Sequence, residues 1–177
     1  AQAWNCLTVG AYTEKVRLPD HDWSGWAPVA PAGGLSPHST TSLSWPSSKW
    51  PIKPEVVFEG GNVAKGHNDS FMAADDLQLL STWRDPQAAQ FAPHNATSAA
   101  SALAARMAAQ IQVDYPQAWP ETVRALIVHA AEWTETMKRQ FLPSSGAATK
   151  RDYARILRIC GYGVPSADRA RYCATNS

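Results

Sequence analysis

Ser98 lies at the junction between a polar loop and a predicted helix, in the stretch FAPHNATSAASALAARMAAQI (residues 91–111). Residues 97–115 are rich in alanine and carry larger apolar side chains at every fourth position, which predicts a helix buried within the protein. A serine in the first turn sits at the positive end of the helix, where backbone N–H groups have no intrahelical partner. Such donors stabilise the oxyanion that forms when a serine hydroxyl attacks a carbonyl group. Ser98 is therefore a candidate nucleophile, although a helix-capping serine is the simpler interpretation of this pattern taken alone.

A nucleophilic serine needs a base, and the chain offers few arrangements that would supply one. Asp20, His21 and Asp22 are adjacent, but neighbouring residues of an extended segment point to opposite sides, so we expect Asp22 not to orient His21. His94 precedes Ser98 closely in sequence and is interpreted as a solvated loop residue. The histidines do not show the spacing of a metal site, so neither a metal nor a cofactor is predicted.

The elements that would position Ser98 fit an α/β layered fold. Residues 5–12, 55–59 and 77–81 are short, apolar and rich in β-favouring side chains, and each is compatible with a strand of a parallel sheet. Between the first two, residues 19–54 are dense in Pro, Gly, Ser and Trp, which predicts a long irregular excursion over the surface.

The second half of the chain is predicted to be helical. A helix starting near Pro120 has one apolar face, formed by Val123, Leu126, Ile127, Ala130 and Trp133, that should dock on the sheet. Thr149, with Asp152 three residues later, is typical of a capping box, and that helix should end at Gly161. A short further element is expected after Pro165.

The composition indicates one globular domain spanning residues 1–177. Hydrophobic residues make up 45% and charged residues 18% of the chain, and the formal net charge of +1 gives no reason to expect nucleic acid or an anionic membrane surface as a partner. Cys6, Cys160 and Cys173 lack paired spacing and are interpreted as three small buried hydrophobes, which favours a reducing, cytoplasmic location. No signal peptide or membrane-spanning run is recognised in the chain, although a signal peptide could lie upstream of it.

NATSAASALAAR is similar to the N-G-T-S-x-A-x-P-x-V-A-G motif of the subtilase family of serine peptidases, with Ser98 at the position of the catalytic serine. Further segments resemble family motifs in the family's order: LTVGA at 7–11, GGLSPHSTTS at 33–42, KPEVVFEGGN at 53–62, YPQAWPETVRALIVHAAE at 115–132 and GYGVPSADRA at 161–170. Each of these segments alone would be a weak signal, whereas their combination in order is specific.

The resemblance implies the C-terminal half of a subtilisin-like three-layer domain with a mainly parallel sheet. Asn95 and Thr97 would then shape the loop around the nucleophile and support its oxyanion. Ala96 stands where the family has glycine, so we expect either an unstrained backbone or a slightly shifted loop there. Ala102 replaces a proline, and EGGN in place of A-P-G is similar to a divergent bacterial branch.

The family's catalytic aspartate and histidine would lie upstream of the LTVGA strand, and their D-[ST]-G and H-G-T-H motifs are absent from this chain. The resemblance therefore implies a serine endopeptidase that cleaves polypeptides through an acyl-enzyme on Ser98 in the full-length parent, with the isolated chain inactive. The alternative is a non-catalytic module that keeps subtilase architecture to bind a peptide or a partner. A half-domain would also expose apolar sheet edges and helix faces, so we expect the isolated chain to self-associate.

Overall fold

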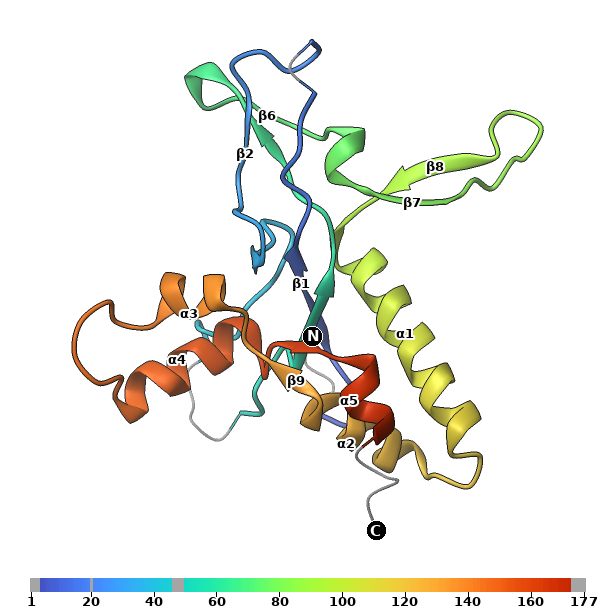
Figure 1. The fold of residues 1–177 in the computed structure, drawn as a ribbon, viewed down its shortest axis with the longest axis vertical. Helices are drawn as coiled ribbons and strands as arrows, with labels where there is room; N and C mark the ends of the chain where they lie inside the picture. The colour runs from blue at the N-terminus through green and yellow to red at the C-terminus, as the bar shows by residue number, and fades with distance from the viewer. Residues whose placement is uncertain (1–3, 20, 46–49, 173–177) are drawn as a thin grey trace.

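A computed structural model describes residues 4–19, 21–45 and 50–172 and shows a mixed α/β chain (Figure 1). Its strands are β1 Val9–Thr13, β2 Ala27–Pro28, β3 Gly34–Leu35, β4 Val56–Glu59, β5 Ala64–Lys65, β6 Phe71–Met72, β7 Leu79–Thr82, β8 Phe91–His94, β9 Ala131–Glu132 and β10 Val164–Pro165. Its α-helices are α1 Ala96–Asp114, α2 Pro120–His129, α3 Glu135–Phe141, α4 Lys150–Cys160 and α5 Ala167–Tyr172. Two single 3-10 turns, His67–Asp69 and Asp75–Leu77, lie between β5 and β7.

A parallel pair of strands, β1 and β4, forms the centre of the molecule. Their register runs from Val9 opposite Val56 to Tyr12 opposite Glu59. β3 adds to the other edge of β1 in the antiparallel sense, so the order is β3-β1-β4. The first two predicted strands are therefore confirmed, with a shift of a few residues for the first.

The third predicted strand, at residues 77–81, is not part of a parallel sheet. β7 occupies most of it and pairs antiparallel with β8, from Leu79 opposite His94 to Thr82 opposite Phe91. Only residues 83–90 connect the two strands, and so short a connection closes a hairpin but cannot make a parallel crossover. In Figure 1 this hairpin extends away from the body of the molecule and leads directly into α1.

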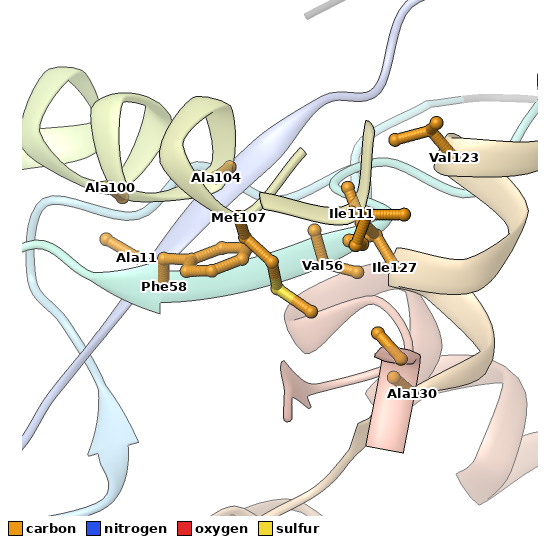
Figure 2. Close-up of a cluster of buried hydrophobic side chains, with 11 residues drawn as sticks. Ala11, Val56, Phe58, Ala100, Ala104, Met107, Ile111, Val123, Ile127 and Ala130 are labelled. Carbon is orange, nitrogen blue, oxygen red and sulfur yellow. The ribbon is translucent and has the colours of Figure 1, made fainter. Parts of the chain in front are cut away.

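Helices cover both faces of the β1–β4 pair, because successive strand residues point to opposite sides. Val56 and Phe58 face α1 and α2 and join a core that also contains Ala11, Met107 and Ile127 (Figure 2). On the other face Val57 packs with a second buried cluster from α3 and α4, formed by Met137, Ile156, Ile159 and Cys160. α1 and α4 therefore lie on opposite sides of the strands, as Figure 1 shows.

The predicted nucleophile helix is present as α1, but it is not buried on all sides. One face, with Ala100, Ala104, Met107 and Ile111, contributes to the core. The opposite face is exposed, and Val113 keeps 77% of its surface accessible. Alanine is small enough for either environment, so an alanine-rich sequence does not distinguish a central helix from one at the edge of the described structure.

Helices α2 and α4 begin where the capping signals in the sequence predict. Pro120 begins α2, whose Val123 and Ile127 are buried as predicted, as is Ala130 directly after the helix. Trp133 instead joins the second cluster and donates its indole N–H to the Gly161 carbonyl at 2.8 Å. The Thr149–Asp152 capping box is confirmed, and hydrogen bonds from Thr149 lower the pKa of Asp152. α5 is the element expected after Pro165, while α3, capped by Thr134, was not predicted.

The stretch 19–54 is mostly irregular among its described residues, with only the two-residue strands β2 and β3. It does not lie wholly on the surface. Ser36, Ser42 and Lys53 are buried, and the Ser36 hydroxyl donates to the Gly61 carbonyl at 2.6 Å.

Candidate active site at the start of helix α1

Ser98 is the third residue of α1 and is exposed to solvent. Asn95, the residue directly before α1, has an extended backbone and occupies the N-cap position, but its side chain makes no capping hydrogen bond. The Asn95 side chain therefore does not pair with the amides of the first turn, which lie beside an accessible hydroxyl. Thr97, between them, is half-buried. The structure brings the three predicted site residues together at the positive end of one helix.

Ala96 adopts a left-handed backbone conformation, with a φ of 67°. Of the two alternatives expected for Ala96, the unstrained backbone is therefore wrong, since this region costs an L-residue about 1–2 kcal/mol, and the shifted loop stays a prediction. A hydrogen bond holds the conformation, because the Ala96 N–H donates to the Gly60 carbonyl at 2.7 Å. The alanine thus occupies a backbone conformation that glycine would adopt at lower cost.

Replacing Ala96 by glycine is expected to raise the free energy of unfolding of the chain by about 0.5–1 kcal/mol, because relief of the strained φ exceeds the added entropy of the unfolded state. Ala102→Gly is the matched control, at an exposed position inside the same helix. There the same change should lower the free energy of unfolding by about 1 kcal/mol. Urea denaturation measures both. Destabilisation of equal size in the two variants would contradict the strain at Ala96.

Two glycines let the end of β4 pass close to the nucleophile loop. A Cβ on Gly60 would lie 2.5 Å from the Ala11 Cβ, and one on Gly61 would lie 2.8 Å from the Leu77 carbonyl oxygen. Asn62 follows them and is completely buried. Its side chain accepts from the Ala30 and Val63 amides and donates to the carbonyls of Lys15 and Ala30. The motif resemblance pointed to this segment, but its hydrogen bonds depend on residues far away in sequence.

The described residues supply no base to Ser98. No hydrogen bond joins its hydroxyl to a side chain in residues 4–19, 21–45 or 50–172, and His94 is exposed on β8. His21 and Asp22, predicted to point apart, are in contact at 2.9 Å, because these residues lie in a turn instead of an extended segment. Their side chains are 77% and 64% exposed, so the two residues form a pair on the protein surface. Asp20 lies outside the described residues.

A buried ionic cluster anchors the residues before β4. Glu55 accepts from the Lys53 ammonium at 2.6 Å, from the Arg124 guanidinium of α2 and from the Thr8 amide just before β1. Lys53 is 1% exposed and also donates to the Cys6 carbonyl at 2.8 Å. The cluster therefore joins the beginnings of both parallel strands to α2.

The cysteines differ in environment. Cys160 is buried in the second cluster, and burial raises its pKa to about 12. Cys6 is exposed, so the expectation of three buried cysteines is wrong for this residue. Cys173 lies outside the described residues. In the described part of the chain, no group of three potential metal ligands is close enough to hold an ion, and no helix has the length and apolarity to cross a membrane.

Comparisons with known proteins add one family to these observations. A model of the subtilase family matches residues 1–163, which is most of the 177-residue chain. No curated protein and no solved structure matches the chain.

Proposed function

Because the chain belongs to the subtilase family of serine peptidases, we propose that Ser98 is the nucleophile of a serine endopeptidase. Its hydroxyl attacks the scissile carbonyl of a polypeptide and forms an acyl-enzyme, which water then hydrolyses. The observation that carries this proposal is the exposure of Ser98 in an uncapped first turn, directly after the left-handed residue Ala96. The amides of that turn would donate to the oxyanion.

The general base and its orienting carboxylate come, in this proposal, from sequence upstream of β1 in the full-length protein. The same upstream part would extend the β1–β4 pair into a larger, mainly parallel sheet between two helical layers. The isolated 177-residue chain then holds a nucleophile without activation, because an unassisted serine hydroxyl is a weak nucleophile at neutral pH.

A fluorophosphonate probe tests this assignment, since it reacts with activated serines. In the full-length protein we expect a covalent adduct that peptide mapping places on Ser98, and in the isolated chain we expect none. A folded full-length protein that forms no adduct would contradict the proposal. It would instead support the second candidate, a non-catalytic module that binds a peptide or a partner.

The described structure is compatible with both candidates. The described residues offer Ser98 no base, so this part of the chain can keep its fold whether or not a triad is completed. The upstream gene sequence distinguishes the two functions. Intact D-[ST]-G and H-G-T-H motifs in the same reading frame favour the peptidase, and their loss favours the binding module.

A further inference from the structure

Glu59, the last residue of β4, uses its carboxylate to join the ends of the two parallel strands. One oxygen, Oε2, accepts from the Glu14 amide at 2.6 Å, and the other, Oε1, accepts from the Gly61 amide at 2.8 Å. Glu14 is the first residue after β1, and Gly61 is the second residue after β4. A single carboxylate therefore binds the backbone just after both strands.

Asn62 strengthens the same connection. Its side-chain amide donates to the Lys15 carbonyl at 2.9 Å, so the two residues after β1 are each held by a side chain of the segment 59–62. Asn62 and Lys15 are 47 residues apart in sequence. The exit of β1 and the exit of β4 are thereby fixed relative to each other.

This connection reaches the nucleophile loop through the backbone of the two glycines. The Gly60 carbonyl accepts from Ala96, and a Cβ on Gly61 would lie 3.3 Å from the Asn95 Cβ. Gly61 has a φ of 80°, so the backbone turns at this residue. The hydrogen bond from the Gly61 amide to the Glu59 carboxylate stabilises this turn. A change in this turn would move the carbonyl that holds Ala96 two residues before Ser98.

We propose that Glu59 is a positioning residue, whose carboxylate sets the start of α1 and thereby the direction of the Ser98 hydroxyl. This inference rests on the proposed function of Ser98. A carboxylate suits the role because each of its oxygens receives one N–H. Glutamine has one acceptor oxygen, and its NH₂ group would face the second N–H donor, so Glu59→Gln preserves shape but breaks one of the two contacts.

The first test compares Glu59→Gln with Glu14→Gln in the full-length protein. Glu14 is the matched control because it is the neighbouring exposed acid and its own side chain makes no hydrogen bond within the described chain. For Glu59→Gln we expect kcat and the fluorophosphonate labelling rate to fall up to about a hundred-fold while KM changes little, since misplacing a nucleophile by about 1 Å has such effects. Glu14→Gln should match the unmutated protein. Equal activity of the two variants would overturn the role of Glu59.

The second test needs no catalysis. Amide hydrogen exchange on the 177-residue chain should be about ten-fold faster at Glu14, Gly61 and Ala96 in Glu59→Gln, with Glu14→Gln unchanged. If Glu59→Gln does not fold, amide exchange in the unmutated chain tests the role of Glu59. Rapid exchange at both Glu14 and Gly61 would show that the carboxylate does not hold these two amides. Absence of labelling in the unmutated full-length protein would overturn the proposed function and, with it, the positioning role. Normal labelling of Glu59→Gln would overturn the positioning role alone.

Discussion

Replacing Ser98 by alanine in the full-length protein is expected to lower peptidase turnover about a million-fold, as loss of the nucleophile does in subtilisin. In the proposed mechanism the acyl-enzyme cannot form without the hydroxyl, and only binding and oxyanion stabilisation remain to assist water. Steady-state cleavage of a chromogenic peptide measures the loss. The same variant should lose fluorophosphonate labelling while keeping its unfolding transition, because the side chain is exposed and makes no hydrogen bond within the described residues.

Ser101→Ala is the control for this experiment. Ser101 lies one turn further along α1, is also exposed and differs from Ser98 in its distance from the uncapped amides. We expect its turnover to stay within about two-fold of the unmutated protein, as for a surface substitution outside the reacting centre. Retention of turnover in Ser98→Ala, or an equal loss in Ser101→Ala, would contradict the assignment of Ser98 as the nucleophile.

The features that sequence predicted well are those with local causes. The capping box of α4, Pro120 at the start of α2 and the β-favouring runs of β1 and β4 each depend on neighbouring residues, and all are present. The placement of Ser98 in the first turn of α1 has the same origin, because a polar loop precedes an alanine-rich helical run.

The features that sequence did not predict arise from contacts between distant segments. The strand at 79–82 has the composition of a parallel strand, but pairing with β8 decides its direction. Ala96 is left-handed because the Gly60 carbonyl holds its amide, and nothing in the residues around position 96 indicates that bond. Glu59 likewise appeared only as a departure from the family motif, since its partner Glu14 lies 45 residues away.

Contacts between distant segments also hold Glu55, which binds the Thr8 amide and the Arg124 guanidinium. Glu55→Gln is expected to lower the free energy of unfolding by about 3–5 kcal/mol, because Lys53 would be left charged and buried without its carboxylate partner. Glu55 is 5% and Lys53 1% exposed, so water cannot replace the lost interaction without opening the start of β4. Urea denaturation of the 177-residue chain measures the change.

Two further variants show whether the ion pair itself is responsible. Lys53→Met should cost less than Glu55→Gln, because Glu55 keeps Arg124 and the Thr8 amide as donors. The double variant should be more stable than the sum of the two single losses predicts, since it leaves no buried ammonium. Glu135→Gln removes an exposed ion pair with Lys138 by the same substitution and should leave the denaturation midpoint almost unchanged. If Glu55→Gln behaved like Glu135→Gln, the cluster would not anchor β4, and the fixed geometry from β4 through Gly60 to Ser98 would need another source.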